Sequence, residues 1–273
     1  MKYKLLLVLS IFGFFSSCSQ EEENLTPNQA REVDFAIEKN QFSRAGKDAF
    51  ELGDSIGIFA VKRSNSSSQA FPGASGNQAH NAKWVKTEDG WRPATVFDKV
   101  LWATDGSAMD FYAYYPFDRS ITNPVEIKMG VALSQAEKSS FFASDKLRAV
   151  NAEGLAEGKV TLLFDHVFSM VQVKMYSDQV LDNTIKVTVD GIYSSLTYNI
   201  GTGQQTLTDK FPVQMYCVNP EQNLYQAVIP SQNIAEGTIF LTCDYKGNTY
   251  QYVSTGVNLE RGTCQKFEIN MKN

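Results

Sequence analysis

Short runs in which apolar and polar residues alternate make up most of this chain. Val33, Phe35 and Ile37 alternate with polar or small residues, and the same two-residue period returns at 170–176 and 185–189. A period of two is that of a strand with one buried face, and no long segment carries the period of an amphipathic helix. Gly, Asn and Asp separate the runs, as they do in turns. The pattern predicts an all-β fold of the sandwich type.

Several segments refine this prediction. Residues 56–61 are apolar on both faces and predict a buried strand, and 109–116 reads as an aromatic strand that Pro116 ends. Residues 62–82, rich in Ser, Asn and Gly, predict a long surface loop of the kind that often carries binding. A short hairpin is expected next, with its turn at Asp89-Gly90, and a capped helical turn at 144–149.

The small and polar stretch 151–158 is the expected domain boundary. The strands after it are more regular than those before it, and two sandwiches in tandem fit a chain of 273 residues. The predicted organisation is therefore an N-terminal sandwich over 33–157 and a C-terminal sandwich over 158–273.

The N-terminus has the features of a bacterial lipoprotein signal peptide. Lys2 and Lys4 precede an apolar run that reaches Phe15 and ends in Ser16-Ser17-Cys18. A basic start, a short apolar run and small residues before a cut site describe a secretory signal, and this run is too short to span a membrane. We expect residues 1–17 to be removed and Cys18 to carry the acyl chains, palmitate among them, that anchor the protein.

The residues after Cys18 support a position outside the cell. Residues 19–30 are polar and without period, so 18–32 is expected to form a flexible tether. The acidic run 21–23 resembles the signal that exports certain Gram-negative lipoproteins to the outer face of the outer membrane. The expected location is the cell surface.

Composition restricts the chemistry of the chain. A net charge of −5 argues against binding to nucleic acid. Apart from Cys18, the cysteines are Cys217, Cys243 and Cys264, which allow one disulfide with a free thiol, or none. No spacing of Cys and His suggests a metal site, and no cofactor is expected.

Catalytic candidates are few. Asp165 and His166 are neighbours in an expected strand, where consecutive side chains point to opposite faces, and His80 lies in the polar loop. No phosphate loop, nucleophile elbow or zinc-protease helix is present, and nothing selects a glycosidase pair among the 30 acidic residues. The sequence predicts a protein without enzyme activity.

Two other features suggest sites. Trp84 and Trp91, with further aromatic residues nearby, form a candidate ligand surface for stacking on sugars, although such residues more often belong to a core. Arg44, in an exposed loop, is a candidate cleavage site for an arginine-specific protease, against the alternative of an ordinary surface arginine.

Taken together, five segments in this order resemble the fimbrillins, the subunits of type V pili, including the broad group of fimbrillin-like lipoproteins. The residues that carry the resemblance are Phe50–Phe59, Val100–Trp102, Asp110–Pro116, Ser144–Ala149 and Val160–His166.

The resemblance implies two transthyretin-like sandwiches, an outer-membrane lipid-anchored precursor and no enzyme activity. In that family, cleavage after an arginine frees the leading strand, and an extended segment of another subunit fills the groove by strand addition. Mapped here, the bond is Arg44–Ala45 and the lost strand is Val33–Ile37. The expected partners are other pilus subunits in a fimbrium.

Two functions are therefore carried forward. The first is a structural or adhesive pilus subunit assembled by donor-strand exchange. Stalk, tip and anchor roles stay open, and the chain end at Asn273, without an evident spare strand, favours a tip or accessory subunit. The second is a monomeric cell-surface lipoprotein that binds a host or bacterial glycan, or a protein ligand, through loop 62–82, Trp84 and Trp91.

Overall fold

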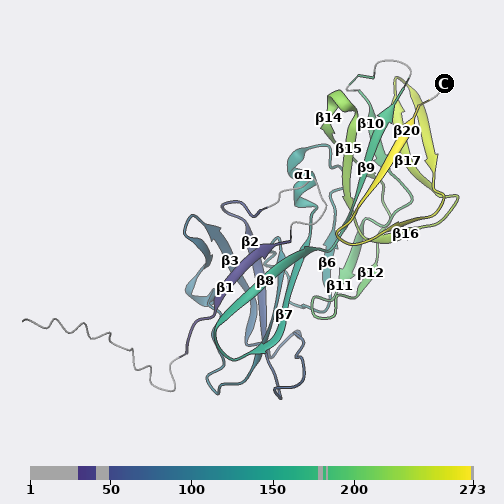
Figure 1. Ribbon diagram of the computed structural model, residues 1–273. Helices are drawn as coiled ribbons and strands as arrows, with labels where there is room; N and C mark the ends of the chain where they lie inside the picture. The colour runs from purple at the N-terminus through teal and green to yellow at the C-terminus, as the bar shows by residue number, and fades with distance from the viewer. Residues whose placement is uncertain (1–29, 41–48, 178–180, 183, 272–273) are drawn as a thin grey trace, which may run out of the picture.

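The protein is built almost entirely of strands. The computed structural model describes residues 30–40, 49–177, 181–182 and 184–271, and within them strands β1 to β20 form five sheets (Figure 1). The helical elements of this part of the chain are α1 (Lys138–Ala143) and the 3-10 turns η1 (Val96–Asp98) and η2 (Pro220–Gln222). The predicted all-β class is confirmed.

The largest sheet has seven strands in the order β1-β8-β7-β5-β2-β3-β4. Its pairs are antiparallel except that β1 runs parallel to β8. The strands are β1 (Asp34–Lys39), β2 (Ser55–Lys62), β3 (Ala79–Thr87), β4 (Gly90–Pro93), β5 (Met109–Tyr115), β7 (Leu147–Leu155) and β8 (Lys159–His166).

The other sheets are smaller and hold mainly the second half of the chain. Their strand orders are β13-β10-β17-β18, β14-β15-β9-β20, β12-β11-β6 and β16-β19. The strands are β6 (Ile127–Gly130), β9 (Ser169–Tyr176), β10 (Lys186–Val189), β11 (Ser195–Tyr198), β12 (Gln205–Leu207), β13 (Val213–Gln214), β14 (Tyr216–Asn219), β15 (Leu224–Ile229), β16 (Gln232–Ile234), β17 (Ile239–Tyr245), β18 (Asn248–Val253), β19 (Val257–Leu259) and β20 (Cys264–Asn270).

Buried apolar side chains gather in three clusters. The N-terminal core draws its buried residues from 33–164 and the C-terminal core from 171–271. A third cluster, the junction core, combines Phe59 and Tyr112 with Phe168, Leu196 and Val228. In Figure 1 the elements of the two outer cores occupy opposite ends of the molecule, and β6 and β11 lie between them.

The strands follow the side-chain pattern that the sequence carries. On β8, Val160, Leu162 and Phe164 are buried while the residues between them are exposed, which is the period-two pattern of a sheet with one wet face. On β2, buried residues on both faces join the N-terminal core to the junction core, as the apolar run 56–61 predicted.

Sheet pairing corrects the expected boundary at 157/158. Strands β7 and β8 form a hairpin, and its connection is 156–158. Because β8 also pairs with β1, residues 159–166 belong to the N-terminal sheet and not to the C-terminal half. A polar, Gly-containing stretch serves equally as a hairpin turn and as a linker, so composition does not distinguish the two.

Two local predictions are also corrected. Residues 147–149 lie in β7, and the helical turn is α1, which begins six residues earlier than predicted and has Ser144 at its C-cap. In the β3–β4 hairpin Thr87 pairs with Gly90, so the turn is Glu88-Asp89 and Gly90, with φ +106°, opens the next strand.

The surface loop between β2 and β3 is anchored by a buried ion pair. The Arg63 guanidinium lies 2.8 Å from the Asp110 carboxylate, with side-chain exposures of 8% and 0%. Asp110 also accepts from the backbone N–H groups of Ala70 (2.7 Å) and Gly154 (3.2 Å). The 62–82 segment, which the sequence predicts as a surface loop, is therefore held against β5 and β7 by these contacts.

Candidate functional site

Strand β1 contains most of the segment 33–37, whose removal the fimbrillin resemblance implies, and it lies at an edge of the large sheet. Among the described strands it pairs only with β8, in parallel register from Asp34↔Lys159 to Lys39↔Phe164. At its start, the Val33 N–H donates to the Val100 carbonyl (2.8 Å), and the Trp102 N–H donates to the Arg31 carbonyl (2.9 Å). One ladder and one short bridge thus hold the strand.

The inner face of β1 completes the N-terminal core. Val33 is 1% exposed and Phe35 is 7% exposed. The Phe35 ring meets Trp84 edge-on at 5.0 Å and Phe111 at 5.6 Å between ring centroids. Loss of the strand would uncover these aromatic rings, at a cost proportional to the apolar area exposed.

The far end of β1 is held by polar contacts. The Lys39 ammonium lies 3.8 Å from Asp145, with side-chain exposures of only 8% and 15%. The His166 Nδ1 is 2.8 Å from the same carboxylate. The Asn40 amide donates to Asp165 at 2.8 Å, directly before the segment that contains Arg44. Together these groups fix the point at which the strand leaves the sheet.

The unpaired side of β1 faces a hollow of about 640 Å³. Phe35 lines this hollow together with Trp84 and Trp91 of the β3–β4 hairpin. The two outer strands of the sheet, β1 and β4, therefore approach the same space without pairing to each other.

The two tryptophans of the candidate ligand surface are core residues. Trp84 is 4% exposed and Trp91 is 8% exposed, and both belong to the N-terminal core. The Trp84 indole N–H donates to the Asp98 carbonyl (3.0 Å), so its polar edge is satisfied inside the protein. Stacking on a sugar needs an exposed ring face, so this arrangement corrects the interpretation of Trp84 and Trp91 as a stacking platform.

Three predicted site residues lie outside the described part of the chain. These are the lipidation candidate Cys18 and the two residues of the candidate cleavage bond, Arg44 and Ala45. The structure describes both flanks of the second site, since Asn40 follows β1 and Ala49 begins the next described segment.

The histidines have structural partners. The two ring nitrogens of His80 lie near the Asn77 side chain and the Thr122 carbonyl. His166 pairs with Asp145 and not with its neighbour Asp165, as strand geometry predicted. Within the described residues no cluster of three or more His, Cys, Asp or Glu side chains could hold a metal ion. Over the same residues, no helix has the length and apolar character needed to cross a membrane.

The three cysteines in the described part of the chain form no disulfide. Cys243 is buried, and burial raises its pKa to about 11, so little thiolate forms near neutral pH. At about pH 8 we expect iodoacetamide to label Cys243 roughly tenfold more slowly in the native protein than in urea. Mass spectrometry of labelled peptides measures this, with half-buried Cys264 as the internal comparison. Equal rates for Cys243 in both conditions would contradict the buried position.

Sequence reasoning missed the polar group at the end of β1. Lys39, Asp145 and His166 come from three segments, and the pairing of β8 with both β1 and β7 brings them together. The available signal was the run Asp145-Lys146 after α1, whose pattern indicated a helix cap instead.

Comparison with known families gives the class of this protein. Residues 43–273 match the family model described as fimbrillin-like, and the chain belongs to that family. The similarity noted in the sequence is thereby confirmed over most of the chain.

The chain is also similar to a curated protein, at low sequence identity. Over 214 residues the chain is 25% identical to a candidate fimbrium subunit, Fim1C, of Bacteroides uniformis. The match covers 74% of this chain and 66% of the relative, just under two thirds of that protein's length.

Solved structures share the fold. A candidate cell adhesion protein of Bacteroides ovatus superposes with a TM-score of 0.70 at 16% identity, over 89% of this chain and 92% of its own. A candidate cell adhesion protein of Bacteroides uniformis gives a TM-score of 0.64 at 20% identity, over 88% and 93% of the two chains. At these identities the likeness shows a common fold.

Proposed function

We propose that this protein is a subunit of a bacterial surface fimbrium that joins its neighbours by exchanging β1 for a strand of another subunit. The fimbrillin-like family and the Fim1C relative support the subunit role. The role is structural or adhesive and involves no catalysis. Export as a lipoprotein through Cys18, with display on the outer membrane, completes the proposal.

The observation that carries the proposal is the position of β1. It is an edge strand, it fills the N-terminal core with Val33 and Phe35, and it connects to the rest of the chain through the segment with Arg44. A cut at Arg44–Ala45 would leave β1 held by noncovalent contacts alone. An incoming strand would then recover the same ladder on β8 and the same buried apolar area.

The cleavage step has a direct test with a matched control. In cells that produce the protein, we expect surface material to begin at Ala45, as read by N-terminal mass spectrometry. Arg44→Gln should keep the leading strand and remove the protein from surface polymers. Arg31→Gln is the control, because Arg31 is exposed at the other end of β1 and, within the described residues, its side chain pairs with exposed Glu157 at 3.5 Å. An acylated Cys18 on every assembled molecule would overturn this step.

A reversible lock tests strand exchange itself. Ala36 and Thr161 are register partners on the outer face of β1 and β8, so paired Ala36→Cys and Thr161→Cys replacements tie the two strands together. We expect the oxidised variant to remain monomeric after cleavage and the reduced variant to polymerise, as measured by native electrophoresis. The single Ala36→Cys variant should polymerise under both conditions. Polymerisation of the oxidised double variant would show that β1 stays in place during assembly.

The alternative of a monomeric glycan-binding lipoprotein loses the stacking role of Trp84 and Trp91, since both are buried. Loop 62–82 stays as its other predicted element.

A further inference from the structure

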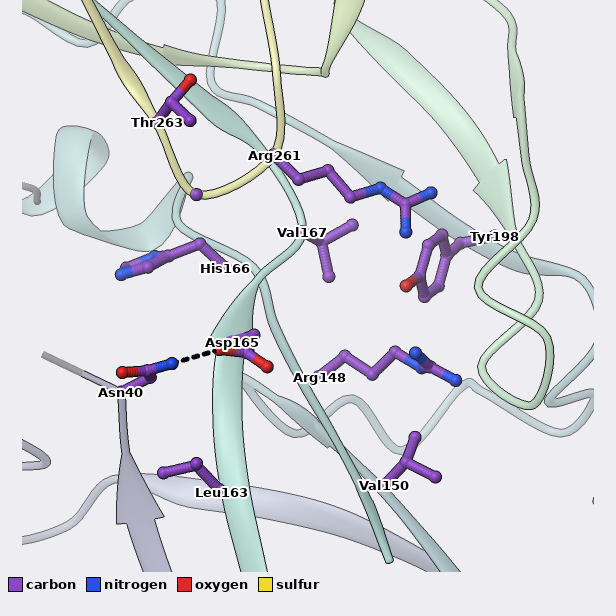
Figure 2. A pocket seen from close by; sticks show the side chains of 11 residues that line it. Asn40, Arg148, Val150, Leu163, Asp165, His166, Val167, Tyr198, Arg261 and Thr263 are labelled. Carbon is purple, nitrogen blue, oxygen red and sulfur yellow. Dashed lines mark hydrogen bonds between the residues drawn. The ribbon is translucent and has the colours of Figure 1, made fainter. Parts of the chain in front are cut away.

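A second hollow lies between the two halves of the molecule. It has a volume of about 660 Å³ and is formed by β7, β8, β11 and the turn before β20 (Figure 2). Its size is that of a small-molecule site. Figure 2 shows Arg148 and Arg261 reaching the Tyr198 ring from opposite sides.

The two guanidinium groups lack an acidic partner. Among the described residues no carboxylate lies within 4.0 Å of either group, whereas other arginines, such as Arg63, have one. Arg148 donates to the backbone carbonyls of Gly201 (2.7 Å) and Ile200. Arg261 donates to the carbonyl of Gly203 and to Gln205 Oε1 (3.4 Å). Each guanidinium has five donors, so donors remain for a ligand.

The positive charges lie close together. The pKa of Arg148 is lowered chiefly by burial, and the charge of Arg261 acts in the same direction, against an opposing effect of Tyr198. Arg148 nevertheless keeps its proton, because an arginine holds it throughout the physiological range. An anion between them would relieve this repulsion.

The free donors converge at one point. A Cβ atom placed on Gly203 would lie 3.3 Å from Arg148 Nη1, 3.4 Å from Arg261 Nη1 and 3.6 Å from the Tyr198 hydroxyl. The glycine, with φ +74°, keeps that position clear of side-chain atoms. Both guanidinium groups and the hydroxyl therefore border one small space beside Gly203, and an anion that enters it, farther from the glycine Cα than a Cβ would be, lies next to both cations.

The other side chains that line the hollow limit the charge that a bound anion can carry. Asp165 also faces the hollow, so with Arg148 and Arg261 the local charge is about +1. His166 is paired with Asp145, whose other oxygen contacts Lys39, and these groups belong to the β1 end. A monoanion such as a carboxylate fits this balance better than a phosphate dianion, which Asp165 would repel.

The rest of the hollow suits a hydroxylated ring. Asn40, Asp165 and Thr263 offer polar groups, and Val150, Leu163 and Val167 offer apolar ones. Leu163 is 44% exposed, which is unusual for a large apolar side chain beside a polar site. A sugar ring presents both hydroxyl groups at its edge and C–H groups on its faces.

We propose that this hollow binds a sugar acid, with Arg148 and Arg261 holding its carboxylate and the neighbouring polar and apolar groups receiving the ring. Both arginines lie outside β1, whereas Asn40 belongs to the leading segment that the proposed cleavage removes, so the binding test uses the uncleaved chain.

Glucuronate is the probe, and the experiment is titration calorimetry on the purified chain. We expect a dissociation constant of about 1 mM for a ligand of this size, and no binding of glucose, which has the same ring without the charge. Arg261→Gln should weaken glucuronate binding at least about tenfold. The thermal midpoint should fall by no more than about 4 °C, because Arg261 is exposed and loses only its bonds to Gly203 and Gln205 and its contact with the Tyr198 ring.

The Asp165→Asn replacement should change the affinity for glucuronate in the opposite direction. It removes the negative charge from the hollow, so glucuronate should bind more tightly and glucose 6-phosphate should begin to bind. Equal binding of glucose and glucuronate, no binding of glucuronate, or an unchanged affinity in Arg261→Gln would overturn the proposal. Equal binding of an acetylated glutamate peptide would assign the arginines to a protein carboxylate and overturn the sugar.

Discussion

Replacing Asp110 by alanine is expected to lower the free energy of unfolding by about 3–5 kcal/mol, the range found when one partner of a buried ion pair is removed. The carboxylate is fully buried, and it accepts from Arg63 Nε (2.9 Å) and Nη2 (2.8 Å) and from two backbone N–H groups. Without it, a buried guanidinium and two amides lose their partner. Urea denaturation followed by tryptophan fluorescence measures the change.

The neighbouring pair of Lys62 and Asp105 is the matched control. Its N–O distance is also 2.8 Å, but the side chains are 46% and 53% exposed. Solvent screens such a pair, so Asp105→Ala should leave the urea midpoint nearly unchanged. Similar losses for Asp110→Ala and Asp105→Ala would show that burial does not set the strength of the Arg63 pair.

Phe35→Ala should cost about 3 kcal/mol of folding free energy in the uncleaved chain, the lower part of the range for removing a buried phenyl ring. The lower part applies because an edge strand can shift to close the cavity. The change removes two edge-on contacts, with Trp84 and Phe111, so the emission of Trp84 should also change. Denaturant unfolding and fluorescence spectra measure both effects.

Glu38 provides the comparison on the same strand. It is exposed on β1, and Glu38→Ala should change stability by less than about 0.5 kcal/mol. A loss below about 1 kcal/mol for Phe35→Ala would mean that β1 is not part of the cooperative core, and the proposed exchange would then lack its driving force.

Local pattern predicted the strands well because each strand carries its own period. Val33, Phe35 and Ile37 gave β1, and the apolar run 56–61 gave β2. Pairing between distant segments was not predictable in this way. Parallel partners such as β1 and β8 are separated by more than a hundred residues, and the sequence of neither strand indicates which strand it pairs with. The pairing of β6 with β11, which links the two halves, was missed for the same reason.

In the candidate site, too, local features were predictable and contacts between distant segments were not. The leading strand was predicted correctly because an alternating run is a local feature, and Arg44 stays a prediction that rests on an arginine in a polar segment. Burial of Trp84 and Trp91 depends on contacts with distant segments, Phe35 of β1 for Trp84 and Phe50 for Trp91, and a local pattern does not predict such contacts. Arg148 and Arg261 are 113 positions apart in the chain and meet only at Tyr198.

The direction of β1 has a consequence for polymers. A replacement strand that copies its ladder runs alongside β8 in the same sense, entering beside Val100 and leaving beside Asp145. Every junction would then repeat one orientation, and a contact that differs on its two sides continues without closing. The resulting fibre would have two unlike ends, and growth at one of them would be chemically distinct from growth at the other.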